Sequence, residues 1–226
     1  MDSREVTSLR TGAATAVAAK YLARRDSRII TICGCGNQGR VQLKALSRIC
    51  QFQTIFAYDR SEEKAVQFAH ELASDLKVSV TVVADLALAV RQSDICVTCT
   101  TSRQPLLGHG DVRPGTFVAA VGADNPEKQE LHPNLLARNK IVCDILEQCA
   151  VMGDLHHALD AGVLTRADVH AELGEVVARR RPGRESEEEI IIFDSTGMAL
   201  QDVAAGAFLY EKAERDGAGV RLNFAA

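Results

Sequence analysis

The sequence lacks the features that several classes of protein need. Its 226 residues carry 26 basic and 30 acidic side chains, so there is no basic excess of the kind that nucleic-acid-binding domains show. No apolar run approaches the roughly 18 residues that a membrane-spanning helix needs. The first fifteen residues are charged where a secretory signal would require an apolar stretch. We therefore expect a cytoplasmic protein that contacts neither nucleic acid nor membrane.

The seven cysteines are an odd number, which in a chain without an export signal favours free thiols over a disulfide framework. Cys96 and Cys99 have the spacing of a metal-binding or redox pair. However, the run 95–98 is typical of a strand, and positions three apart in a strand point to opposite faces. Two thiols on opposite faces cannot bind one ion. We predict buried, unreactive cysteines and assign no metal site.

The chain does contain a regular alternation of short apolar runs with helical patterns. The runs are rich in Ile, Val and Thr and are continuously apolar, as strands covered on both faces are; they fall at 28–33, 54–58, 79–83, 95–98, 116–121, 140–143 and 190–193. Helices are predicted at 11–24, 38–49, 62 onward (capped by Ser61), 86–92 (capped by Asp85), 165–180 and 199–213. This alternation predicts an α/β fold, a Rossmann-type doubly wound and mostly parallel sheet. We place the dinucleotide-binding domain at 25–198 and interpret 1–24 and 199–226 as flanking helical segments.

A glycine-rich loop, GCGNQG at 34–39, joins the first apolar run to the helix that follows. Gly34 would make the tight turn, Gly36 would let the backbone approach a pyrophosphate, and Gly39 would let helix and strand pack closely. The free N–H groups at the start of the helix would then hold the phosphate charge. The motif alone is weak evidence, but its position between a strand and a helix predicts a dinucleotide site.

An acidic residue ends the second run, as this type of site requires. Asp59 would accept hydrogen bonds from the ribose hydroxyls and would repel a 2′-phosphate, which favours NAD over NADP. Arg60 follows immediately and is a cation that would weaken this preference. A purely structural glycine turn without a cofactor is the alternative.

Two further polar segments directly follow predicted strands, where ligands of doubly wound sheets bind. Asp124 follows the run 116–121, and an acid there could orient or deprotonate an amine; the Asp-Asn-Pro sequence is equally typical of a turn. Ser195 and Thr196 follow the run 190–193. Their hydroxyls could meet a ligand or cap the next helix.

Taken together, these segments resemble the ornithine cyclodeaminase/mu-crystallin family, which also contains archaeal alanine dehydrogenases and cyclic ketimine reductases. The matching stretches occur in family order and span nearly the whole chain: LRTGAA at 9–14, GCGNQ at 34–38, YDR at 58–60, VGADNPEK at 121–128 with Glu130-Leu131, and FDSTG at 193–197 with QDVA at 201–204.

The resemblance assigns most of these residues to a cofactor site. It implies that Asn37 and Gln38 line the pyrophosphate, that Asp59 holds the adenosine ribose, and that Thr100 touches the cofactor. A second group is implied to lie near the nicotinamide; its members are Val121, Gly122, Ala123 and Ser195.

The remaining residues are implied to handle the substrate. Asp124 matches the catalytic acid, and Arg10 matches an arginine between the substrate carboxylate and the cofactor. Lys128 and Thr196 match positions near the substrate. The implied partner is a small amino acid or imine.

The leading reaction that the resemblance implies is redox-neutral: NAD takes hydride from the α-carbon of ornithine, the side-chain amine closes the ring, ammonia leaves, and the hydride returns to give proline. The alternatives within the family are reduction of a cyclic ketimine and the interconversion of pyruvate and alanine. A protein that binds a dinucleotide without turnover is the competing class.

The resemblance also implies a difference in length. Family members are homodimers of chains well over 300 residues long, which begin with a separate domain of roughly a hundred residues that forms the dimer interface and grips the substrate carboxylate. We expect that domain to be largely absent here, through a misplaced start codon, an excised fragment or a natural truncation. The helices at 11–24 and 199–213 would then expose an apolar patch.

Overall fold

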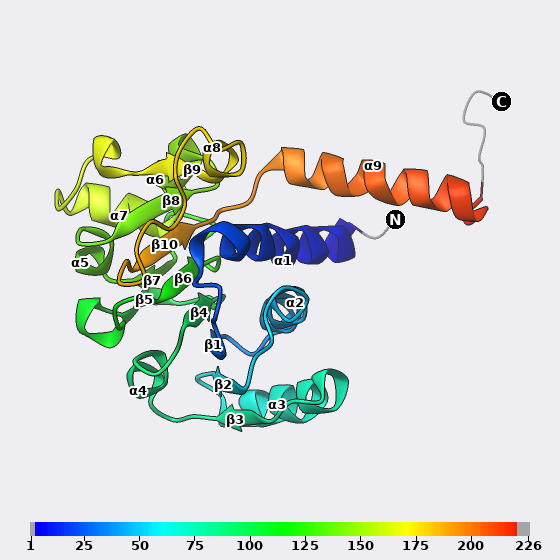
Figure 1. Cartoon of the computed structure of the whole chain (residues 1–226), viewed down its shortest axis with the longest axis horizontal. Helices are drawn as coiled ribbons and strands as arrows, with labels where there is room; N and C mark the ends of the chain where they lie inside the picture. The colour runs from blue at the N-terminus through cyan, green and yellow to red at the C-terminus, as the bar shows by residue number, and fades with distance from the viewer. Residues whose placement is uncertain (1–2, 221–226) are drawn as a thin grey trace.

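The computed structural model describes residues 3–220, and a parallel sheet of eight strands lies at its centre (Figure 1). In sheet order the strands are β3 (Val80–Val82), β2 (Thr54–Tyr58), β1 (Ile29–Cys33), β4 (Ile95–Thr98), β6 (Phe117–Ala120), β10 (Ile191–Asp194), β8 (Lys140–Cys143) and β9 (Ala171–Glu172). All seven predicted strands are confirmed, each within one residue of its expected bounds. The Rossmann-type α/β prediction is therefore correct.

The direction in which the strand order runs changes at the middle of the sheet. From β1 the chain moves outward to β2 and β3, then crosses back to β4 on the other side of β1 and continues outward to β6. Such a switch point opens a crevice at the carboxyl ends of the strands. The last strand, β10, inserts between β6 and β8, so the segment that follows it also begins at this edge.

Helices cover both faces of the sheet because alternate strand residues point to opposite sides. Ile30 and Ile32 of β1 face a core layer formed with α1 (Ser3–Leu22), α2 (Asn37–Leu46), α3 (Glu62–Leu76) and α8 (Leu173–Val177). Cys33 faces the opposite layer, formed with α4 (Leu86–Val90), α5 (Pro133–Leu136), α6 (Leu146–Met152) and α7 (Asp154–Asp160). The predicted caps are confirmed: Ser61 accepts the N–H of Lys64, and Asp85 accepts that of Leu88.

The helix predicted at 165–180 is wrong. The segment forms a single 3-10 turn at Arg166–Asp168, then strand β9, and only then the short helix α8. Asp168 does accept the N–H of Thr165, so the local capping pattern is real, but it closes one turn only. Ala171 pairs with Val142 at the edge of the sheet and is buried in the core. Sheet pairing thus overrides the local helical pattern.

The two terminal helices lie side by side, and α9 (Ala199–Asp216) extends away from the sheet (Figure 1). The helix predicted at 11–24 begins earlier, at Ser3, and its buried Leu22 belongs to the core. None of the residues 199–216, all of which are described, is buried on α9, and Phe208 is 62% exposed. The expected exposed apolar side chains are therefore present on α9. Of the two predicted flanking segments, residues 1–2 and 221–226 lie outside the described residues.

A second, two-stranded parallel sheet, β5 (Arg103–Leu107) and β7 (Gln129–Leu131), joins the loops that follow β4 and β6. It has no counterpart in the predicted elements. Within residues 3–220, no helix combines the length and the apolar character needed to cross a membrane.

Candidate functional site

Each of the three glycines in the loop at 34–39 has a different steric environment. Gly34 has φ +105°, and a Cβ built on it would lie 2.7 Å from the carbonyl oxygen of Cys99. A Cβ on Gly39 would lie 2.2 Å from the Gly34 carbonyl oxygen, so α2 packs directly on the turn. A Cβ on Gly36 would meet no described atom within 4 Å. Gly36 therefore faces open space, and Gly34 and Gly39 bring strand and helix together.

Asp59 lies beside this loop at the end of β2. Its Oδ2 accepts the N–H of Cys35 (2.9 Å) and its Oδ1 accepts the N–H of Ser61 (2.9 Å), which fixes the carboxylate at the loop. Arg60 is exposed next to it. Asn37, at the start of α2, is exposed and donates its amide to Ser8 of α1 (2.9 Å).

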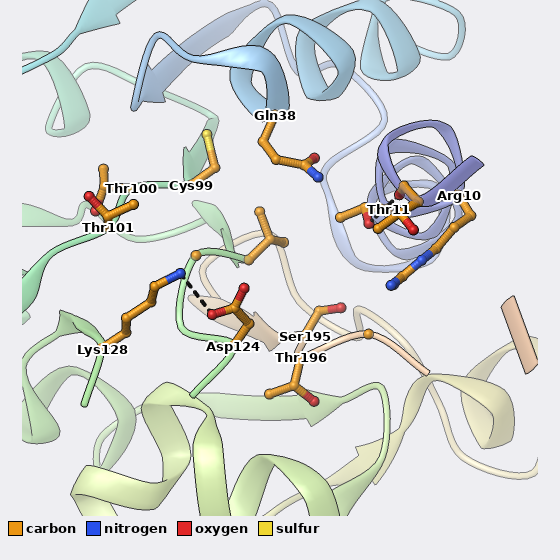
Figure 2. A pocket seen from close by; sticks show the side chains of 14 residues that line it. Arg10, Thr11, Gln38, Cys99, Thr100, Thr101, Asp124, Lys128, Ser195 and Thr196 are labelled. Atoms are coloured by element: carbon orange, nitrogen blue, oxygen red, sulfur yellow. Dashed lines mark hydrogen bonds and ion pairs between the residues drawn. The ribbon is translucent and has the colours of Figure 1, made fainter. Parts of the chain in front are cut away.

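A pocket of about 200 Å³ opens at the carboxyl ends of the central strands (Figure 2). It brings together nine of the predicted site residues: Arg10, Gln38, Thr100, Val121, Gly122, Asp124, Lys128, Ser195 and Thr196. The other predicted residues lie outside its lining: Gly34, Gly36, Asn37, Gly39, Asp59, Arg60 and Ala123, of which Ala123 is buried. Five residues of the lining were not predicted from the sequence: Thr7, Thr11, Cys99, Thr101 and Gly197.

Most of the missed residues had a signal in the sequence. Thr11 and Gly197 belong to stretches that carried the resemblance, and Cys99 and Thr101 flank Thr100. Thr7 precedes Thr11 by four residues and so lies on the same face of α1. Thr7 and Thr11 reach the pocket because α1 lies over the switch point. The sequence did not predict that position of the helix.

An ion pair stands at one side of the pocket. The Lys128 ammonium lies 2.7 Å from the Asp124 carboxylate, and Asp124 is 58% exposed. Figure 2 shows Gln38 projecting from α2 on the other side of the pocket. The loop from Asp124 to Lys128 is also a turn, because Asn125 accepts the N–H of Glu127 (3.0 Å). The turn that the Asp-Asn-Pro sequence predicted is therefore present, and it presents Asp124 at the pocket.

Ser195 and Thr196 do not cap α9, which begins after Met198 without a side-chain cap. Ser195 instead donates its hydroxyl to Asp144 (2.9 Å), which also accepts the N–H of Gly197 (2.6 Å). The buried Asp144 thus fixes this segment against the end of β8.

A second buried carboxylate, Glu130 on β7, supports the opposite wall. Its Oε1 accepts the N–H of Thr100 (2.5 Å), and its Oε2 accepts the N–H of Gly122 (3.0 Å). Asp154, at the start of α7, accepts the N–H groups of Glu130 and Leu131 (both 2.8 Å). Burial, followed by the charge of Asp154, raises the pKa of Glu130 to about 7, and burial raises the pKa of Asp154 to about 6. No role for Glu130 was predicted from the sequence.

Cys96 in β4 and Cys99 just after it lie on different faces of the sheet. Cys96 packs in the core layer beneath α4 and α5, whereas Cys99 packs against the layer of α1 and α2. Burial raises the pKa of both thiols, and it raises that of Cys35 to about 12. The thiols near the glycine loop therefore stay protonated at neutral pH. Among the described residues, no group of three His, Cys, Asp or Glu side chains is arranged to hold a metal ion.

The model of the ornithine cyclodeaminase/mu-crystallin family matches residues 1–217. The chain belongs to this family. The resemblance that the sequence motifs predicted is thereby confirmed.

Named relatives and solved structures match nearly the whole chain. It is 44% identical over 224 residues to an alanine dehydrogenase of Archaeoglobus fulgidus, an alignment that spans 99% of this chain and 69% of the relative. The solved structure of an archaeal alanine dehydrogenase dimer with bound NAD superposes with a TM-score of 0.94 at 44% identity, over 99% of this chain and 69% of that one. The structure of the Δ1-pyrroline-2-carboxylate reductase of Thermococcus litoralis, in complex with NADH and L-proline, superposes with a TM-score of 0.93 at 36% identity. The match covers 96% of this chain and 68% of that one.

Proposed function

We propose that this chain binds NAD(H) and catalyses the interconversion of a small α-amino acid and the corresponding imino or keto acid. The observation that carries the proposal is that Gln38, in the glycine loop, and the Asp124–Lys128 pair line one pocket. The relatives support it, because those with the highest identity above are an alanine dehydrogenase and an imine reductase.

The residues of the loop fit a dinucleotide. The space in front of Gly36 is open, and α2 begins there without a side-chain cap, so its N–H groups would meet the pyrophosphate. The Oε1 of Gln38 is buried without a hydrogen-bond partner among the described residues, and it faces the same pocket. Asp59 would hold the adenosine ribose. When bound, the nicotinamide would supply a hydride acceptor or donor.

The chain's own side chains would bind the substrate and move its proton. Arg10 and Lys128 are the cations in the pocket lining, and they would hold a carboxylate. Asp124 would accept a proton from the substrate amine during oxidation and return it during reduction. Thr196 and Ser195 would limit the space beside the reacting carbon.

Cyclodeamination of ornithine is the second candidate, and membership of the family favours it. It would use the same residues, with Asp124 holding the side-chain amine. The two reactions differ in their net redox change, because the cyclodeaminase reaction leaves the cofactor unchanged. A protein that binds the dinucleotide without turnover is the third outcome.

The test measures NADH consumption at 340 nm with pyruvate plus ammonia and with Δ1-pyrroline-2-carboxylate, and proline formation from ornithine with NAD. The variant Asp124→Asn is expected to lose at least about a hundredfold in kcat. The matched control is Glu127→Gln, since Glu127 is an exposed carboxylate on the same loop, paired with Arg103. NADH binding without turnover on all three substrates would contradict an enzymatic function and leave a binding protein.

A further inference from the structure

We propose that Glu130 is a positioning residue: its carboxylate joins the two loops that line the cofactor pocket and so sets the pH range over which the pocket binds NADH. This inference rests on the proposed function, since it concerns the same site. Glu130 itself lies outside the pocket lining.

The contacts of Glu130 connect segments that the chain does not connect directly. Thr100 follows β4 and Gly122 follows β6, and both line the pocket. The two carboxylate oxygens of Glu130 accept one N–H each: Oε1 that of Thr100, and Oε2 that of Gly122. A Cβ built on Gly122 would lie 2.5 Å from the carboxylate carbon and from both oxygens, so the carboxylate packs directly against this loop. Moving the Glu130 side chain would therefore move both loops.

The groups around Glu130 come from α7, β1, β4 and the loop that follows β4. Asp154 of α7 is the charged one, and it lies beneath the backbone of β7. The hydroxyls of Thr98 on β4 and of Thr100 just after it are neutral and lower the pKa of Glu130. Three thiols also lie close enough for the charge of Glu130 to raise their pKa: Cys33 of β1, Cys96 of β4 and Cys99 just after β4. Burial raises the pKa of each thiol, so they remain neutral, and the negative charge of Asp154 disfavours ionisation of Glu130.

Ionised and protonated Glu130 hold the loops differently. An ionised carboxylate is an acceptor at both oxygens, as its bonds to Thr100 and Gly122 require. A protonated one carries an O–H donor at one oxygen, and that oxygen would face an N–H donor. One loop is then released. Because the pKa of Glu130 is raised to about 7, this change falls within the range in which the protein can be assayed.

The experiment titrates the intact chain with NADH by fluorescence at pH 6 and at pH 8.5. For the unmodified protein we expect the Kd to be about tenfold higher at pH 6, the equivalent of one lost hydrogen bond to a charged acceptor. Glu130→Gln presents an amide N–H₂ to one of the two loop N–H groups at every pH. It should therefore show the weaker Kd at both pH values. The matched control Glu188→Gln, at an exposed carboxylate, should follow the unmodified protein.

A second measurement needs no variant. The amide proton resonances of Thr100 and Gly122 are followed by NMR between pH 5.5 and 8.5, and we expect both to shift through one common midpoint near pH 7. Unshifted resonances, or a Glu130→Gln protein with the affinity and pH profile of the unmodified chain, would overturn the inference alone. Failure of the unmodified protein to bind NADH at either pH would overturn the proposed function as well.

Discussion

Arg10 on α1 and Asp202 on α9 are joined by an ion pair of 3.2 Å, although they lie 192 residues apart in the sequence. The same guanidinium donates to the side-chain oxygen of Gln201 (2.9 Å). A Cβ built on Gly197 would lie 2.3 Å from Nη1 of Arg10, so Arg10 packs against the segment that follows β10. The terminal helix α9 therefore fixes the orientation of a cation that lines the pocket.

Replacing Asp202 should weaken substrate binding more than it weakens the fold. In Asp202→Ala we expect the KM of the amino-acid substrate to rise about three- to tenfold, with kcat within about twofold, because Arg10 loses its fixed orientation. The free energy of unfolding should fall by less than about 1 kcal/mol, as Asp202 is partly exposed. Steady-state kinetics and urea denaturation measure both. Asp216→Ala removes the pair with Lys212 at the far end of α9 and is the control; an equal KM effect there would contradict a role through Arg10.

The glycine loop offers a pair of substitutions with opposite outcomes. Gly39→Ala places a methyl group 2.2 Å from the Gly34 carbonyl oxygen, and it should lower the free energy of unfolding by about 1–3 kcal/mol. Gly36→Ala meets open space at φ −82° and should change stability by less than about 1 kcal/mol. It should nonetheless raise the Kd of NADH at least about tenfold, since the methyl group occupies the approach of the pyrophosphate. Denaturation curves and NADH titrations of both variants test this; normal NADH binding by Gly36→Ala would contradict the loop as the phosphate site.

The sequence predicted the central sheet because seven of its eight strands are runs of mainly apolar and β-branched residues, and strands at its centre, such as β4 and β6, are buried at every position. The strands that were missed, β5, β7 and β9, contain no such apolar run. Ala171 and Glu172 form a two-residue strand inside a segment with a helical capping pattern, and only the neighbouring β8 makes that strand favourable. The small sheet of β5 and β7 was missed for the same reason, since each strand depends on a partner far away in the chain.

The site was predicted to the extent that it follows from topology. Loops after parallel strands meet at one edge, so the strand pattern alone places Asp124 and Ser195 at that edge, whereas Thr100 was added by the family resemblance. It does not assign Glu130, because the importance of this residue comes from two backbone N–H groups that belong to other loops. The contact between Arg10 and α9 is likewise a long-range one that no local pattern encodes.

The carboxylate of Asp59 should decide the choice between NADH and NADPH. It is fixed beside the loop by the N–H groups of Cys35 and Ser61, and its charge would repel a 2′-phosphate. In Asp59→Ser the ratio of the Kd for NADPH to that for NADH should fall by about tenfold, the equivalent of 1.4 kcal/mol. Fluorescence titration with both cofactors measures the ratio. Glu62→Gln, which removes an exposed carboxylate at the start of α3, is the control. An unchanged ratio in Asp59→Ser would show that the Asp59 carboxylate does not distinguish the ribose from its 2′-phosphate.

The stability of the fold should decline as the pH rises from about 4.5 to about 7. The pKa of Glu130 is raised to about 7 and that of Asp154 to about 6, chiefly by burial, whereas both groups would lose their protons near pH 4 in the unfolded chain. Within this window the folded state binds more protons than the unfolded state, so the free energy of unfolding falls with rising pH. Below it, carboxyls with a lowered pKa, such as Asp94, reverse the trend.

Urea denaturation at pH 5 and pH 8 should therefore give a free energy of unfolding that is about 1–3 kcal/mol lower at the higher pH. In Glu130→Gln the difference between the two pH values should shrink, because the amide cannot ionise, whatever the variant's absolute stability. Glu188→Gln, an exposed change of the same kind, should leave the difference as it is. A larger free energy of unfolding at pH 8 than at pH 5 in the unmodified protein would mean that Glu130 and Asp154 are already ionised in the fold at pH 5, and that the N–H groups around them outweigh the cost of burial.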